Sequence, residues 1–97
     1  MENTSGERLR ELMAELGMTQ KAFGEKLYMI QQSISKYATG RQRVTDAFAQ
    51  RIVEAFPDYN PLWITGKSNV KYSQKKLIYD AVNGLEKVVD ILKQIDV

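Results

Sequence analysis

A short polar segment in the first half of the chain could bind the edges of nucleic-acid bases. Its side chains are Gln31, Gln32, Ser33 and Ser35, followed by Lys36. Glutamine can pair bidentately with adenine, hydroxyls bind bases or phosphates, and lysine binds phosphate or guanine. Exposed helix faces are usually polar without any such role, but this segment contains no acidic residue that would repel phosphate. The segment therefore favours contact with a nucleic acid.

Most catalytic chemistry lacks its usual residues in this sequence. The absence of cysteine excludes a disulfide framework, a thiolate zinc site and a cysteine nucleophile, and the absence of histidine removes the commonest general base and metal ligand. No glycine-rich phosphate loop is present, and the carboxylates of Glu7, Glu11 and Glu15 lie beside Arg8 and Arg10 in the pattern of a solvated helix face. We predict that the protein is not an enzyme and requires no cofactor and no metal.

The formal net charge of +2 conceals an uneven distribution along the chain. Between Met18 and Lys76, ten basic residues stand against four acidic ones, whereas the two flanks carry a net negative charge. A basic middle segment is typical of a polyanion-binding protein, although an uneven solvated surface would look the same. Charge alone leaves both interpretations open.

Helix signals follow one another along the whole chain. Apolar residues recur at helical spacing from Leu9 to Leu16, and Gly17 ends that segment. Thr19 is the next N-cap candidate, a further helix is expected from Gln31 to Ala38, and Thr45 and Asp46 open a fourth that Pro57 stops. Asn60 followed by proline starts a short fifth helix that ends at Gly66.

Beyond Gly66 the composition changes. Residues 67–72 are polar and are interpreted as a linker, and Ser73 is expected to cap a final helix that runs to about Ile95. We therefore divide the chain into a domain of residues 1–68 and an appended element of residues 69–97.

The second and third expected helices are joined by a turn of about three residues. Phe23 and Leu27 give the first of these helices an apolar face, and Ile34 and Tyr37 give the second its own. Two short helices joined so tightly cross steeply, which projects the second as a reading head.

At these residues the chain resembles the Cro/repressor (XRE-type) helix-turn-helix family and, within it, the DNA-binding domains of lambdoid phage repressors. The resemblance covers roughly residues 7–66 and rests on four short motifs in the right order. They are Leu16-Gly17-Met18-Thr19-Gln20, Gln31-Gln32-Ser33-Ile34-Ser35, Tyr37 with Gly40, and Asn60-Pro61 with Ile64-Thr65-Gly66. It implies an all-α fold, a five-helix lambda-repressor-like domain, here followed by one long C-terminal helix.

The resemblance also implies a function and roles for individual residues. The protein is expected to be a sequence-specific, double-stranded DNA-binding regulator, a repressor, that acts on a palindromic operator. The helix beginning near Gln31 would lie in the major groove, with Gln31, Gln32, Ser33 and Ser35 reading bases and Gln20 supporting Gln31. Backbone contacts or supporting roles are expected for Thr19, Gln20, Lys21, Lys36, Arg41 and Arg43.

Four positions depart from the family pattern. Tyr28 stands where a turn glycine is usual, at a cost of about 1 kcal/mol if its φ is positive. Gly24 replaces a small alanine at the approach of the two helices, and Ile30 replaces a serine or threonine cap. The motif around Trp63 is one residue shorter than usual. These departures leave the fold in place and put the tilt of the reading helix in question.

The last helix is expected to form a homodimer. Its apolar residues recur at spacings of three and four, at Ile78, Ala81, Leu85, Val88, Leu92 and Ile95. Leu77, Val82, Val89 and Ile91 widen this stripe beyond the seam of a two-stranded coiled coil. Packing on its own domain is the alternative, but a helix of that length spans about 34 Å, more than five short helices easily cover.

Two other interpretations remain. An antitoxin or adaptor with an unidentified protein partner would carry the same fold, and the chain could equally be the DNA-binding part of a longer regulator. The polar N-terminus lacks the apolar run of a signal peptide, and no apolar stretch is long enough to span a membrane. We therefore expect a cytoplasmic protein without a membrane partner.

Overall fold

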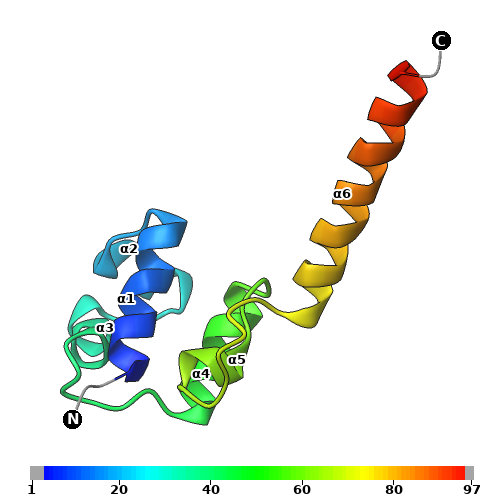
Figure 1. Ribbon diagram of the computed structural model, residues 1–97. Coiled ribbons are helices and arrows are strands. Elements are labelled where there is room, and N and C mark those ends of the chain that lie inside the picture. Colours follow the sequence, from blue (N-terminus) through cyan, green and yellow to red (C-terminus); the bar gives the residue numbers. More distant parts are fainter. Residues whose placement is uncertain (1–3, 96–97) are drawn as a thin grey trace.

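The computed structural model describes residues 4–95, which fold into α-helices (Figure 1). They are α1 (Thr4–Leu16), α2 (Gln20–Lys26), α3 (Gln31–Ala38), α4 (Asp46–Ala55), α5 (Pro61–Ile64) and α6 (Gln74–Ile95). Within this range there is no β-strand, although an isolated antiparallel bridge pairs Tyr59 with Tyr72. The all-α fold of five short helices and one long one confirms the fold predicted from the sequence.

The predicted cap residues begin the helices. The side chains of Thr19, Thr45 and Asn60 accept hydrogen bonds from the backbone N–H two or three residues further on, at 3.1 Å in each case. The Ser73 hydroxyl likewise accepts a hydrogen bond from the Lys76 N–H at 3.1 Å. Each bond satisfies one of the unpaired N–H groups at a helix start, which is why these residues set the boundaries.

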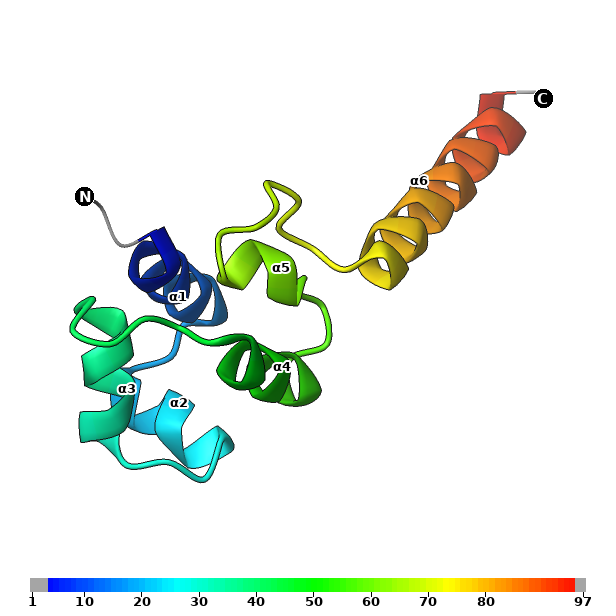
Figure 2. The same ribbon diagram turned by 90° about the horizontal axis from the view of Figure 1, so that it is seen from below.

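The hydrophobic core lies among α1–α5, which surround it from several directions (Figure 2). Its largest fully buried side chains are Leu9, Leu12, Phe23, Ile34, Ile52 and Ile64. Two aromatic stacks contribute to it. The ring centroids of Phe23 and Phe56 lie 5.5 Å apart, and those of Tyr37 and Phe48 lie 4.1 Å apart. The core fixes α2 and α3 against α1 and α4, and it therefore positions the predicted reading helix.

Residues 67–72, interpreted from their polarity as a linker, pack on the domain together with Ser73 and form a strap of residues 67–73. The backbone N–H of Asn60 donates to the Lys71 carbonyl at 3.0 Å, and the Asn60 amide donates to the Val70 carbonyl at 2.9 Å. The N–H of Ser73 donates to the Asp58 carbonyl at 2.7 Å. Polar composition alone did not reveal this packing, because these three contacts are made by backbone groups of the strap.

The carboxylate of Glu15 joins the strap to α1. It accepts hydrogen bonds from the hydroxyls of Tyr59 at 2.7 Å and Tyr72 at 2.9 Å, and it binds the ammonium group of Lys71. The hydrogen bond from Lys71 lowers the pKa of Glu15, with further lowering from the two tyrosines, against the raising effect of burial. Burial, together with this carboxylate, raises the pKa of Tyr59. Glu15 is thus exposed, as expected for a solvated face, and also has a structural role that its position in the sequence did not indicate.

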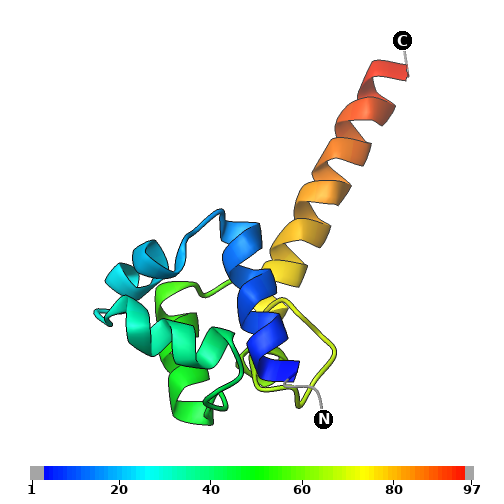
Figure 3. The same ribbon diagram turned by 90° about the vertical axis from the view of Figure 1, so that its left-hand side faces the viewer.

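Helix α6 leaves the domain after its first turn and projects into solvent (Figures 1 and 3). The described chain is accordingly elongated, with extents of 60 × 26 × 20 Å. Large apolar side chains along α6 are about half exposed, for example Leu85 at 65% and Leu92 at 58%. Within residues 4–95, no helix is long and apolar enough to cross a membrane.

Candidate DNA-binding surface

The turn between α2 and α3 is tighter than an alanine-containing helix pair would allow. The N–H of Met29 donates to the Gly24 carbonyl at 2.8 Å, which folds the turn back onto α2. A Cβ atom on Gly24 would lie 2.6 Å from the Met29 carbonyl oxygen, a contact that backbone atoms cannot avoid by rotating a side chain. Gly24 therefore permits a backbone approach that the usual alanine would block.

Tyr28 has a positive φ of 56°, so the cost that was conditional on a positive φ applies to this turn. Its side chain is 93% exposed, so little packing compensates for the left-handed backbone. The next cap residue, Ile30, has extended backbone angles and makes no side-chain hydrogen bond to α3. Helix α3 nevertheless begins at Gln31, where the sequence predicted it, because its inward residues are packed in the core.

The buried and exposed residues of α3 define its outer face. Ile34 and Ala38 point into the core with no exposed surface. Gln32 and Lys36 lie one turn apart on the opposite side, and both are exposed. Gln31 is also exposed, whereas Ser33 and Ser35 are half-buried.

Helical geometry divides the predicted base-reading residues between two flanks of that face. Gln31 and Ser35 share one flank, being four residues apart, and Ser33 lies on the other. Gln32 stands between them. All four adjoin the solvent-facing surface of α3, and their individual contacts with bases stay a prediction.

The start of α2 carries three of the predicted supporting residues. Thr19 caps the helix, Lys21 is exposed, and Gln20 is half-buried at the first helical position. Within the described part of the chain, no hydrogen bond joins Gln20 to Gln31. The proposed support of one glutamine by the other is therefore a prediction for the DNA complex.

Ion pairs leave the positive charge concentrated around the helix-turn-helix. Lys67, Lys71 and Lys76, which belong to the strap and the start of α6, pair with acidic side chains at 2.5–3.1 Å. The predicted backbone-binding residues Lys21, Lys36, Arg41 and Arg43 are exposed and have no ion pair among residues 4–95. The basic charge seen in the sequence is therefore neutralised on the strap and retained beside α3.

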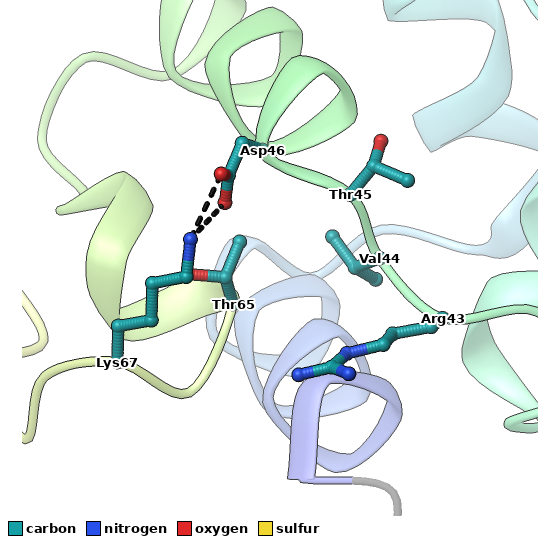
Figure 4. A pocket seen from close by; sticks show the side chains of 6 residues that line it. All are labelled: Arg43, Val44, Thr45, Asp46, Thr65 and Lys67. Atoms are coloured by element: carbon teal, nitrogen blue, oxygen red, sulfur yellow. Dashed lines mark hydrogen bonds and ion pairs between the residues drawn. The ribbon is translucent and has the colours of Figure 1, made fainter.

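Arg43 lines a pocket of about 210 Å³ between the start of α4 and the end of α5 (Figure 4). On the other side of this pocket the Lys67 ammonium group meets both carboxylate oxygens of Asp46, at 2.7 and 2.8 Å. Arg43 takes no part in that pair. Its guanidinium is therefore not neutralised by the acid at the start of α4.

Three arginines hold the C-terminal ends of the short helices. Arg51 donates to the Leu27 carbonyl at the end of α2 at 2.6 Å, and Arg8 donates to the Trp63 carbonyl in α5 at 2.6 Å. Arg10 donates to the carbonyl of Ala38, the last residue of α3. Carbonyls at helix ends lack partners within the helix and carry partial negative charge, so a guanidinium suits them well.

The sequence analysis placed Arg8 and Arg10 on a solvated face and missed these contacts. Arg10 is exposed as expected but also holds Ala38, and Arg8 is half-buried. The partners lie 24 to 55 residues away along the chain, so no local spacing indicates them. A local signal exists for α5 alone, which has no basic residue in its last turn, whereas α2 and α3 carry Lys26 and Lys36 there.

Six predicted dimer residues lie along α6. Leu85, Val88 and Leu92 are more than half exposed, Ile78 is 57% exposed, and Ala81 is also exposed. The side chain of Ile95 lies outside the part that the structure describes. Their proposed contacts with a second chain stay a prediction.

The five-helix body, the tight turn after Gly24 and the outward polar face of α3 define a helix-turn-helix protein. A family model described as helix-turn-helix matches residues 9–64, more than half of the chain. The chain therefore belongs to this family of Cro/XRE-type DNA-binding regulators. Comparisons with curated proteins and with solved structures found no match.

Proposed function

We propose that this protein is a sequence-specific transcriptional repressor that inserts α3 into the major groove of double-stranded DNA. The observation that carries the proposal is the acid-free outer face of α3, flanked by basic side chains without ion pairs. A protruding polar helix matches the width of the major groove, and unpaired positive charges suit the phosphates on either side.

The residues divide by role. Gln31, Gln32, Ser33 and Ser35 face base edges, with Gln32 at the centre of the exposed face. Gln20 approaches the backbone at the start of α2 and supports Gln31. Phosphate or minor-groove contacts come from the remaining group, which consists of Thr19, Lys21, Lys36, Arg41 and Arg43.

Self-association through α6 would place two reading heads on one duplex. The stripe of Ile78, Ala81, Leu85, Val88, Leu92 and Ile95 supports a homodimer, because the domain leaves the first five of these side chains uncovered. Two heads related by a twofold axis require a palindromic operator with half-sites about 34 Å apart, one turn of the double helix.

The DNA experiment compares a base-reading and a backbone-binding variant on a selected operator. Duplexes are first selected from a random pool, and binding to the operator and to a scrambled duplex is then titrated with salt. Gln32→Ala should lower the operator-to-scrambled preference by about 1–3 kcal/mol, the value of a bidentate base contact. Arg43→Ala should weaken binding to both duplexes equally and reduce the salt slope by about one charge.

Lys75→Ala is the matched control, because Lys75 is an exposed cation at the start of α6, away from the proposed reading face. It should leave both the preference and the salt slope unchanged. An unchanged operator preference in both Gln31→Ala and Gln32→Ala would show that α3 is not the reading helix.

The dimer experiment adds two charges to the apolar stripe. Leu85→Glu with Leu92→Glu should give a monomer in sedimentation at roughly tens of micromolar protein, a range in which even a weak dimer forms. Asn83→Glu with Gln94→Glu adds the same charge on the polar side of α6 and should leave the association intact. Unmodified protein that sediments as a monomer would contradict the proposal.

A protein-interaction module is the second candidate, and the uncovered apolar side of α6 favours it. An antitoxin or adaptor would use this side for a different protein instead of a second copy. Unmodified protein that is monomeric and shows no salt-dependent binding to any duplex would support this candidate over the repressor.

A further inference from the structure

The apolar surface of α6 covers four of the seven positions of its heptad repeat. Positions a are Ile78, Leu85 and Leu92, and positions d are Ala81, Val88 and Ile95. Positions e are Val82 and Val89, and positions g are Leu77, Gly84 and Ile91. The polar residues from Tyr79 to Gln94 are restricted to positions b, c and f.

A two-stranded coiled coil does not cover so wide a surface. Its seam buries positions a and d, while positions e and g lie at the edge and usually carry Glu or Lys. Here Val82 and Val89 are each 47% exposed and Ile91 is 55% exposed in the single chain. A dimer that buried only a and d would leave these side chains as an apolar strip in water.

The residue types at positions a and d independently indicate an assembly of more than two helices. Leucine occupies a at two of its three positions, and the β-branched residues Val88 and Ile95 occupy d at two of three. In parallel coiled coils, leucine at a with isoleucine at d shifts the preference from two strands to three or four. The alanine at the remaining d position, Ala81, does not oppose this preference.

The charges on α6 do not obstruct the close approach of several helices. From Lys76 to Lys93 its acidic and basic side chains lie on the polar side, and Lys76 pairs with Asp80 one turn away within the same helix at 3.1 Å. Neither flank of the apolar surface carries a charge between Leu77 and Ile91. Copies of α6 can therefore surround one another without burying an unpaired ion.

We propose that four copies of α6 form a four-helix bundle, which joins two dimers into a tetramer. In such a bundle each helix buries a broad face instead of a narrow seam, so positions e and g are covered by the second dimer. The inference rests on the self-association proposed above. Its consequence is that one assembly carries four reading heads and binds two operators at once.

The projection of α6 is compatible with this assembly. The helix has 22 residues, about 33 Å of length, and its later turns extend away from the five-helix body (Figures 1 and 3). A bundle can therefore form beyond the heads and leave the outer face of α3 accessible.

Sedimentation equilibrium without DNA tests the tetramer. Unmodified protein at roughly tens of micromolar should have four times the 11.1 kDa chain mass. Val82→Glu with Val89→Glu spares a and d and should halve the mass to that of a dimer. Ile91→Glu, on the opposite flank, should do the same, and Asn83→Glu with Gln94→Glu should leave the mass unchanged. Circular dichroism checks that each variant remains helical.

A dimer mass for the unmodified protein, or flank variants with the mass of the unmodified protein, would overturn the tetramer. Because this measurement contains no DNA, its outcome is separate from the repressor proposal. A tetramer without operator binding would overturn the repressor alone, and a dimer with operator binding would overturn the bundle alone.

A capture assay tests whether one tetramer binds two operators at once. An operator duplex fixed to a surface should capture a second, fluorescent operator through the unmodified protein. Val82→Glu with Val89→Glu should bind the fixed operator and lose the capture. A confirmed tetramer that captures no second operator would overturn this consequence.

Discussion

The guanidinium of Arg10 in α1 donates a hydrogen bond to the carbonyl of Ala38, the residue that ends α3. The C-terminal end of the proposed reading helix is thereby held by a residue 28 positions earlier in the chain. Arg51 holds the end of α2 in the same way through the Leu27 carbonyl. The angle between the two helices thus depends on arginines outside them, in addition to the core.

Replacement of Arg10 by methionine should loosen the end of α3. The lost charge-assisted hydrogen bond should lower the free energy of unfolding by about 2 kcal/mol, measured by urea denaturation. Operator preference should also fall, because the reading helix is less firmly placed. Gln50→Met, on the exposed side of α4, is the control and should change neither quantity. An Arg10→Met protein with unchanged stability would show that the contact contributes nothing.

Gly24→Ala should destabilise the domain by about 1–3 kcal/mol, because the added Cβ would meet the Met29 carbonyl at 2.6 Å. Gly84→Ala is the matched change, since nothing lies within 4 Å of a Cβ built there, and it should stabilise its helix by up to about 1 kcal/mol. Both are compared by thermal unfolding in the Leu85→Glu, Leu92→Glu background, where association does not contribute. Equal melting temperatures for the two variants would contradict the steric argument.

Tyr28→Gly should stabilise the protein by about 1 kcal/mol, because glycine adopts the φ of 56° without strain and the exposed ring contributes little packing. Tyr28→Ala retains the strain and should give no such gain. Thermal unfolding of the two variants separates relief of strain from loss of the aromatic ring. A gain of the same size in both would assign the effect to the ring.

The Glu15 cluster should make stability depend on pH in the acidic range. Because the folded pKa of Glu15 lies below its ordinary value of 4.5, its stabilisation is complete above that pH and is lost as the pH falls through the folded pKa. Glu15→Gln should therefore be less stable than the unmodified protein at pH 7, and the difference should shrink below about pH 4.5.

Glu54→Gln serves as the control for that pH series, because Glu54 is exposed on α4 and has no ion pair among residues 4–95. Its denaturation midpoint should follow that of the unmodified protein at every pH. A constant difference between Glu15→Gln and the unmodified protein from pH 7 to pH 3 would contradict the assigned linkage.

The sequence by itself determined the helices and their order. Thr19, Thr45, Asn60 and Ser73 cap the helices that they were predicted to cap, and Gly17, Gly40 and Gly66 adopt the positive φ expected at helix ends. These signals are local, since a cap binds an N–H two or three residues away and an apolar face repeats within a turn. They remain readable in a single chain without knowledge of the fold.

Only the tertiary structure decided which contacts hold those helices together. The strap on Glu15, the arginines at the helix ends and the approach of Met29 to Gly24 each depend on where the folded backbone brings two groups. Arg10 and Glu15 look like solvated helix residues in the sequence because their partners lie 28 and 44 positions further along the chain. A long-range hydrogen bond produces no repeating pattern in the sequence, because it requires only one correctly placed donor and one acceptor.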